Sequence, residues 1–493
     1  MRSMTGRAAA WAAAAVLGVT GLATANNIRV SNVTVTGMDT AARTAFVRFD
    51  LSWDNAWRDA ENWDAAWVFI KFKPQASNDW QHATLSSVSG DHVPAANSAV
   101  TAVPGGTGAF VYRSGGYTGN VAYARMKLKW DYGTNGYAFA YGTQLDVSVH
   151  AIEMVYVPQG SFYLGSTGTE TGRFYQPDET GQTTNAYPVT SEAALEIGPG
   201  AGKLWGTSSS GSSTIGPEGI LDPAFPKGFK AFYCMKYEIT QGQYAEFLNK
   251  LTSGQASARY YYTTTYRYTI SGTYPSFSAA APDRACNHLI WADVCAYAEW
   301  AGLRPMTELE YEKAGRGTKA PLSNEYVWGT IGIARLTNET GVAGSGLSTP
   351  LPANANCCYG NMSLMGAVGP TRAGIFATAS STRELAGASY WGIMELGGNL
   401  WERVITVGNT DGRAFTGNHG KGTLTVAGEA TEATWFPSMG SLGKGIGFRG
   451  SSFNDNNAFP FLCVSDRSYA VGAAFTARSA THSHGWRGVR TAP

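Results

Sequence analysis

The sequence predicts an N-terminal all-β sandwich followed by an α+β, turn-rich domain. The first observation behind this prediction is the alternation of Val47, Phe49 and Leu51 with polar residues, which recurs in later runs as far as Val149. A period of two places one face of a strand in a core and the other face in water. The second observation is that clusters of Gly, Pro and Asn separate these runs, which is typical of β-sandwiches. We therefore expect a sandwich over residues 26–152.

The third observation is that helix signals occur only in the later part of the chain. Thr240 with Gln243, and Thr307 with Glu310, have the spacing of capping boxes, in which each side chain bonds the backbone N–H of the other residue. Turn-forming residues dominate between and after these helices. We expect a second, turn-rich α+β domain over residues 153–493.

Length and charge limit the possible functions. A chain of 493 residues is long enough for two domains. Its formal net charge of +1 gives no electrostatic reason to bind nucleic acid or an anionic membrane. We expect a protein or carbohydrate ligand and no nucleic-acid partner.

The N-terminus predicts export. Arg2 and Arg7 precede an apolar run, and Ala23-Thr24-Ala25 has the form of a signal-peptide cleavage site. The apolar run is short for a membrane span, and no other segment is long and apolar enough to cross a bilayer. We expect a signal peptide over residues 1–25 and a secreted, periplasmic or cell-surface protein.

Four tryptophans in the predicted sandwich, Trp53, Trp57, Trp63 and Trp67, allow two interpretations. Aromatic rings stack on sugar rings, so the four could form a carbohydrate-binding face. Packing in a core is the more common role of clustered tryptophans. Burial of these side chains decides between the two.

The C-terminal stretch has an unusual composition. Two similar motifs, GFRG at 447–450 and GWRG at 485–488, enclose a segment, 451–485, without Lys, Glu, Gln, Met or Trp. A gap of this length in five residue types is a strong compositional deviation. We interpret the two motifs as a scaffold and the segment between them as a presented surface.

Several motifs resemble those of one known family and occur in the same order. They are MVYVPQGSF at 154–162, KYEIT at 236–240, AEWAGLRPMTELEYE at 298–312, VWG at 327–329, GNLWE at 398–402, FRGSSF at 448–453 and GWR at 485–487. The region 153–493 thus resembles the formylglycine-generating enzyme, or sulfatase-modifying factor, family. The resemblance implies a C-type-lectin-like fold.

The same resemblance argues against the family's oxidase activity in this chain. Formylglycine-generating enzymes use two cysteines that hold copper, and soft thiolate ligands suit that metal. The corresponding positions here are near Asp455 and Pro460, and Cys463 is the only cysteine nearby. We expect no copper and lean toward a protein that is not an enzyme.

Calcium is the cofactor that the resemblance does imply. The family binds a structural calcium ion at its GNxWE motif, and the matching residues here are Glu395, Gly398, Leu400 and Glu402. Carbonyl and carboxylate oxygens in a tight turn are suitable ligands for this ion. The alternative is that Asn399 and Glu402 only bond the amides of the turn.

The composition of 451–485 has two explanations. Some proteins with this fold are targets of diversity-generating retroelements, and asparagine-type codons altered at adenines cannot encode the five missing residue types. Alternatively, Gly/Ser-rich turns simply lack long side chains and the surface is fixed. Under either explanation we predict a ligand surface made of Phe453, Asn454, Asp455, Phe459, Phe461, Ser468, Tyr469, Phe475, Thr481, His482 and His484.

Three functions remain open from the sequence. The first is an exported ligand-binding protein with a variable C-terminal surface. The second is a formylglycine-generating oxidase that acts on a sulfatase cysteine. The third is a structural or adhesive surface component that binds through its sandwich.

Overall fold

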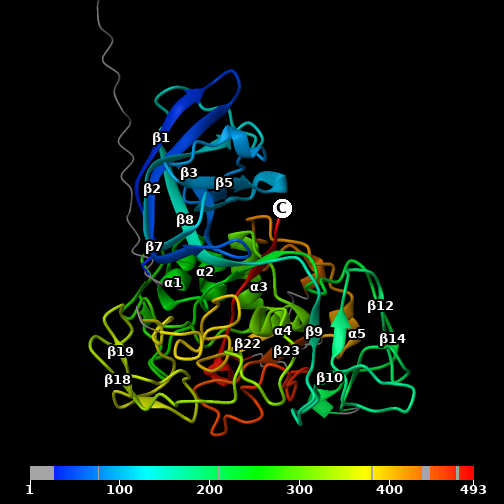
Figure 1. Cartoon of the computed structure of the whole chain (residues 1–493). Coiled ribbons are helices and arrows are strands. Elements are labelled where there is room, and N and C mark those ends of the chain that lie inside the picture. The colour runs from blue at the N-terminus through cyan, green and yellow to red at the C-terminus, as the bar shows by residue number, and fades with distance from the viewer. Residues whose placement is uncertain (1–26, 76, 209–210, 379–380, 436–444, 473–476) are drawn as a thin grey trace, which may run out of the picture.

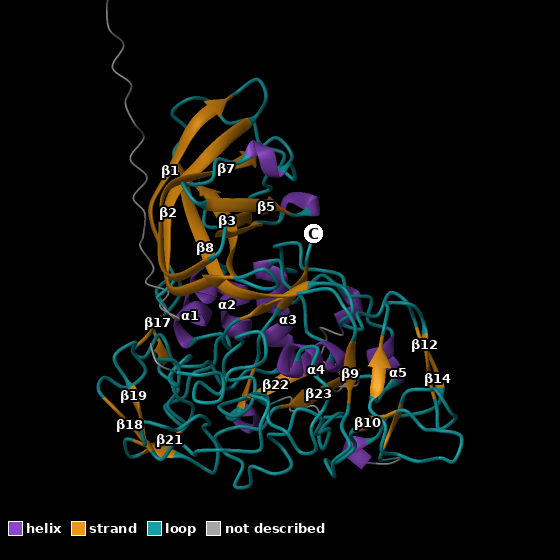
Figure 2. Ribbon diagram, in the orientation of Figure 1, coloured by secondary structure: helices purple, strands orange, loops and turns teal. Residues whose placement is uncertain are grey.

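A computed structural model describes residues 27–493, except for 76, 209–210, 379–380, 436–444 and 473–476. A narrow upper part contains the N-terminal strands, and a broader lower part contains the α-helices and most of the loops (Figures 1 and 2). The predicted signal peptide lies outside the described residues. Within the described residues, every helix is too short or too polar to cross a bilayer.

Two antiparallel sheets make up the upper part. The first is three-stranded, in the order β1-β2-β7. The second is seven-stranded, in the order β25-β15-β8-β3-β6-β5, with β4 paired to β3. The strands are β1 (Arg29–Asp39), β2 (Thr44–Arg58), β3 (Asp64–Pro74), β4 (Gln81–His82), β5 (Ser98–Ala102), β6 (Ala109–Arg113), β7 (Tyr117–Asp131), β8 (Leu145–Val157), β15 (Phe232–Met235) and β25 (Val489–Thr491).

The two sheets share a buried core. Val47, Phe49 and Leu51 of β2 are buried, which confirms the predicted alternation. They belong to the same cluster as Val68 and Ile70 of β3. The period-two pattern of β2 therefore has a direct cause, since one face of the strand is enclosed between the sheets.

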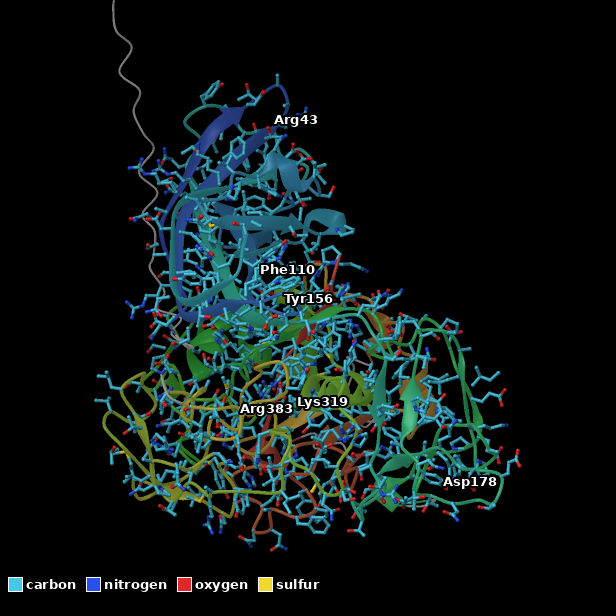
Figure 3. The ribbon with its side chains drawn as sticks, in the orientation of Figure 1. Arg43, Phe110, Tyr156, Asp178, Lys319 and Arg383 are labelled. Carbon is cyan, nitrogen blue, oxygen red and sulfur yellow. The ribbon has the colours of Figure 1, made fainter. Side chains whose placement is uncertain are left out.

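The seven-stranded sheet continues from the upper part into the lower part. Strand β8 runs without interruption through the predicted domain border at residue 152, and β15 pairs with its second half. The second face of the sheet packs on α3 (Trp291–Ala301), where Phe69 and Trp300 are in edge-to-face contact. Figure 3 shows Phe110 and Tyr156 at this junction.

The helices lie beneath the sheet, and both predicted capping boxes are confirmed. Thr240 and Gln243 bond each other's backbone at the start of α1, and Thr307 and Glu310 do so at the start of α4. The helices are α1 (Gln241–Asn249), α2 (Ser253–Arg259), α3, α4 (Glu308–Arg316) and α5 (Thr410–Arg413).

Short strands and turns form the remainder of the lower part. The two-stranded pairs use β9 (Phe162–Leu164), β10 (Phe174–Tyr175), β11 (Tyr187–Val189), β12 (Leu195–Ile197), β13 (Trp205–Gly206), β14 (Gly219–Leu221), β16 (Ile270–Ser271), β17 (Ser278–Ala279), β18 (Asn338–Thr340), β19 (Thr349–Leu351), β20 (Ser363–Leu364) and β21 (Ala367–Val368). A three-stranded sheet, β23-β22-β24, lies at the centre of the lower part, with β22 (Trp401–Ile405), β23 (Ile446–Arg449) and β24 (His484–Gly485).

The four tryptophans of the N-terminal region do not form an exposed face. Trp53 lies in the core between the two sheets, and Trp67 lies on the opposite side of the second sheet. Trp67 Nε1 donates a hydrogen bond to the Ala301 carbonyl of α3 at 2.8 Å. Trp57 and Trp63 are half-buried. Core packing is therefore the role of this cluster, and an adhesive face built on the four rings loses its support.

Candidate functional site

The two C-terminal motifs flank a single strand. β22 pairs with β23 in antiparallel orientation and with β24 in parallel orientation, so that Glu402 lies between Arg449 and Gly485. The segment between the motifs leaves this sheet along one edge and returns along the other. It lies at the end of the molecule away from the N-terminal strands (Figure 1).

Both motifs are held by buried arginines. Arg449 donates to Glu308 at 3.1 Å and to Glu312 at 2.8 Å, and these carboxylates belong to α4. Arg487 donates to Glu402 at 2.5 Å and to the Met394 carbonyl at 2.8 Å. A buried guanidinium with several acceptors fixes the loops that supply them. The prediction that these motifs are scaffold therefore has a physical basis.

Two further arginines, which belong to none of the sequence motifs, hold the interior of the segment. Arg467 donates to Glu308 at 2.8 Å, and Arg478 donates to Asp293 of α3 at 2.6 Å. The composition could have pointed to these two residues, because Arg is the only long charged residue type in segment 451–485. Their acidic partners are far away in the sequence and could not be assigned from it.

The predicted ligand surface is only partly exposed. Phe459 and Tyr469 are exposed at 44% and 41%, whereas Asn454, Asp455, Phe461, Ser468 and His482 are half-buried. Phe475 lies outside the described residues.

The prediction is wrong for three residues. Phe453 is fully buried in a cluster with Leu336 and Met362. Thr481 is buried and donates to the Arg478 carbonyl at 3.0 Å. His484 is a buried residue of β24 whose ring contacts Phe448. All three therefore support the fold of the segment rather than its surface.

The half-buried Phe461 and the exposed Tyr469 pack against Trp401, and we define these three residues as an aromatic patch. Their ring centroids are 5.3 to 5.9 Å apart. Trp401 is almost fully buried and supports the other two rings from β22. The exposed side chain of Phe459 belongs to the same loop. Such exposed aromatic surface is typical of binding sites.

Asp455 lies near one of the two positions at which the sequence resemblance placed the family's cysteines. Its carboxylate accepts hydrogen bonds from the hydroxyls of Ser452 at 2.6 Å and Ser451 at 3.3 Å. Burial raises the pKa of this carboxyl above its ordinary value, although the serine hydroxyls counteract that effect. Asp455 therefore stabilises the turn that follows β23.

The six cysteines are buried and free. Cys463 Sγ donates to the Asn324 carbonyl at 3.4 Å, and burial raises the pKa of its thiol. Burial also raises the pKa of Cys234 and of Cys358 to about 12. Thiolate chemistry requires the opposite conditions, namely exposure and a lowered pKa.

The predicted calcium turn is largely occupied by the protein's own hydrogen bonds. Both carboxylate oxygens of Glu395 accept from the Gly374 amide, at 2.9 and 3.0 Å. The Leu400 amide donates to Glu238 at 3.0 Å, and Arg487 binds one oxygen of Glu402. The other Glu402 oxygen, Oε2, is buried and has no hydrogen-bond partner among the described residues.

This turn fits a calcium ion only in part. Glu402 Oε2 and the backbone carbonyls can serve as oxygen ligands, but Glu395 must first exchange its bonds to Gly374. Within the described ranges, no group of three or more His, Cys, Asp or Glu side chains is arranged to hold a metal ion. Calcium therefore stays a prediction.

Comparison with known proteins identifies the family. The model of the sulfatase-modifying factor enzyme 1-like domain matches residues 144–491. The chain belongs to this family. No curated protein matches the chain. In this sulfatase-modifying factor-like protein the match begins one residue before β8, so the strand that joins the upper and lower parts falls within the family domain.

Proposed function

We propose that this chain is an exported ligand-binding protein of the sulfatase-modifying factor family. In this proposal a β-sandwich precedes a C-type-lectin-like domain, and the outward side chains between β23 and β24 contact the ligand. The observation that carries the proposal is a division of roles along the segment. The buried arginines at 449, 467 and 487 and the half-buried Arg478 fix its path through ion pairs, while Phe459 and Tyr469 remain exposed.

Exposed aromatic rings on a rigid support favour binding. Tyr and Trp are frequent in binding hot spots because they bury much apolar surface and lose little conformational entropy. Here Tyr469 and Phe461 are supported by Trp401, a residue of the central sheet. The ligand is a protein or a carbohydrate on the cell exterior.

The oxidase alternative requires a reactive thiol pair. By the resemblance, the corresponding positions are near Asp455 and Pro460, with Cys463 as the cysteine nearby, and burial raises the pKa of its thiol. We expect no formylglycine when the protein is incubated with copper and a cysteine-containing sulfatase peptide. Formation of the aldehyde, detected by mass spectrometry, would replace the binding proposal with the oxidase.

The binding surface is tested with a double variant, Phe459→Ala with Tyr469→Ala. Arrays of immobilised glycans and a displayed peptide library serve as probes, and the control is Tyr141→Ala, a ring in the upper part of the molecule that is 71% exposed. We expect a probe bound by the parent protein to lose at least about tenfold in affinity in the double variant. The control should bind normally. Unchanged binding by the double variant would place the ligand elsewhere.

The second part of the proposal is that a diversity-generating retroelement varies the coding sequence of residues 451–485. The structure adds which codons should vary and which should not. The DNA near the gene should contain a near-copy of the 451–485 coding stretch and a reverse transcriptase. The codons that differ should be those of outward residues such as Asn456, Asn457 and Tyr469. Codons of Arg467 and Arg478 should be unchanged, because both side chains hold buried carboxylates. Absence of any such copy would leave a fixed surface.

Calcium at the turn of Glu395, Gly398, Leu400 and Glu402 is tested by thermal unfolding. If the ion binds the folded state, its removal by a chelator lowers Tm, since a ligand stabilises the state that binds it. Glu402→Gln should then remove the difference between the two conditions. An unchanged Tm in the parent protein would reject the ion.

A further inference from the structure

A buried lysine lies between two buried carboxylates where the upper and lower parts join. Lys236 follows β15, Glu153 lies in β8 and Asp64 begins β3. Lys236 Nζ is 3.2 Å from Glu153 Oε2 and 3.7 Å from Asp64 Oδ2. Each of the three residues is at most 3% exposed.

The sheet register brings the three side chains to one face. Asp64 pairs with Val155, which is two residues from Glu153 in β8, and the Lys236 amide donates to the Glu153 carbonyl at 2.9 Å. Residues two apart in a strand share a face. The surroundings of the amine are aromatic, because Nζ lies 5.0 Å from the centre of the Trp57 ring and 5.5 Å from that of Tyr237.

The charges of this triad do not balance if all three groups are ionised. One ammonium faces two carboxylates, and an uncompensated charge in a dry interior is costly. A proton on one carboxyl group relieves the imbalance. Burial raises the pKa of Asp64 above its ordinary value, in spite of Lys236 beside it, and this direction is consistent with a proton on Asp64. With that proton in place, a neutral carboxylic acid lies next to the Lys236 side chain.

Two donors polarise the Asp64 carboxyl group. Trp53 Nε1 donates to Oδ2 at 2.9 Å, and the Trp57 amide donates to Oδ1 at 3.1 Å. Fixed N–H groups of this kind stabilise the negative charge that develops when a nucleophile adds to a carbonyl. A lysine amine is such a nucleophile once it has lost its proton, and Glu153 is placed to accept that proton.

We propose that Lys236 and Asp64 join in an intramolecular amide bond, with Glu153 as the proton acceptor. Lys236 transfers a proton from its ammonium group to Glu153, and the amine then attacks Cγ of protonated Asp64. The new N–C bond forms, the C–OH bond of Asp64 breaks, and the hydroxyl leaves as water with a second proton from the amine. Glu153 remains protonated. The overall change is the loss of one water, with no oxidant or cofactor.

The site has the features that this condensation needs. Three adjacent strands hold the reacting groups close together. The reaction is therefore effectively unimolecular and does not depend on a diffusive encounter. A cavity of about 10 Å³ borders Glu153 and Tyr237, which is about the space that one water molecule needs. The bond would link β3 to the end of β15 and so connect the N-terminal strands covalently to the family domain.

Mass spectrometry of the purified full chain tests the bond directly. The denatured protein should be lighter than its sequence by one water, about 18 Da. Trypsin should fail to cleave after Lys236 and should release a branched peptide in which residues 231–250 are attached to residues 59–71. The parent protein alone gives this result, so the test does not depend on whether a variant folds.

Variants then assign the roles. Lys236→Met and Glu153→Gln should both have the full mass, and Lys73→Met, a change elsewhere in β3, should keep the loss of one water. Separate peptides of unmodified mass from the folded parent protein, after prolonged incubation between pH 5 and pH 9, would overturn the proposal and leave an ion-paired triad. A branch point at Glu153 rather than Asp64, or an unaffected bond in Glu153→Gln, would overturn the assignment of roles.

Discussion

At the scale of single residues, buried arginines add polar links to the apolar clusters of the lower part. These links join turns and loops that are far apart in the sequence. Arg449 connects α4 to the C-terminal segment, and Arg487 connects β22 to the loop before it. Each guanidinium satisfies several acceptors at once, so its removal leaves buried carboxylates without a partner.

The first prediction concerns Arg449. Arg449→Met leaves Glu308 and Glu312 with one donor fewer inside the protein, and we expect a loss of about 3–5 kcal/mol in the free energy of unfolding. Urea titration followed by tryptophan fluorescence measures the change. Lys421→Met is the control, because the Lys421 side chain is 65% exposed and its ammonium group is 3.7 Å from the Glu432 carboxylate. The control should change stability by less than about 1 kcal/mol. Equal effects of the two changes would contradict a structural role for the buried pair.

The second prediction concerns the pH dependence that Glu395 confers. Burial raises the pKa of Glu395 to about 7 in the folded protein, so the folded state binds this proton more tightly than the unfolded state does. The resulting stability is complete below the ordinary carboxyl pKa, about 4.3, and is lost as the pH rises through about 7.

Glu395→Gln should reduce the loss of stability between pH 5 and pH 8, by an amount on the order of 2–3 kcal/mol. The measurement is the free energy of unfolding at both pH values, with a chelator present. Glu238 and Glu402 lie nearby and remain in both proteins, as does Arg487, so the comparison isolates Glu395. The exposed Glu179→Gln serves as the control. A variant with the same pH dependence as the parent protein would contradict the assignment.

At the scale of secondary-structure elements, the sequence predicted what local patterns encode. The alternation in β2 and the capping boxes of α1 and α4 depend on neighbours a few positions apart, and the structure confirms them. The family match confirms the resemblance that the ordered motifs suggested.

The features of the fold and of the candidate site that the sequence did not predict depend on contacts between distant parts of the chain. Nothing in the sequence indicates that the two C-terminal motifs pair with opposite edges of β22, or that Arg478 binds Asp293 of α3. In turns, side-chain direction follows no period, so sequence could not distinguish the buried Phe453 from the exposed Phe459. The continuity of β8 across residue 152 was likewise hidden, because a strand that serves two layers has the same local pattern as any other.

The third prediction uses these two phenylalanines of one segment. Phe453→Ala opens a cavity in a cluster that includes Leu336 and Met362, and we expect a loss of about 3–5 kcal/mol in the free energy of unfolding. Phe459→Ala removes a ring that is 44% exposed, and its effect should stay within about 0.5 kcal/mol. Chemical unfolding of both variants measures the difference. A large loss for Phe459→Ala would show that this side chain supports the fold instead of the surface.

At the scale of the whole molecule, the seven-stranded sheet makes the upper and lower parts interdependent. One face of β3 and β8 packs against the sheet β1-β2-β7, and the other face packs against α3. Trp67 and Lys71 of β3 both donate hydrogen bonds to backbone carbonyls at the end of α3. Neither part can separate without exposing a face of the same sheet to water, which is costly in proportion to its apolar area.

The fourth prediction follows from this shared sheet. Calorimetry of the full chain should give one unfolding transition, with equal calorimetric and van't Hoff enthalpies. A chain reduced to residues 144–493 keeps the matched family domain but loses β3. Strand β8 then becomes an unpaired sheet edge, and the Trp300 ring loses its contact with Phe69. We expect this shortened chain to aggregate or to lack a cooperative transition, because exposed strand edges and apolar faces associate.

Trp67→Ala in the full chain provides a milder test: it removes the ring that contacts α3, and it should lower the single Tm without splitting the transition. Two transitions in the full chain, or a stable and monomeric 144–493, would mean that the family domain folds independently of the strands that precede it.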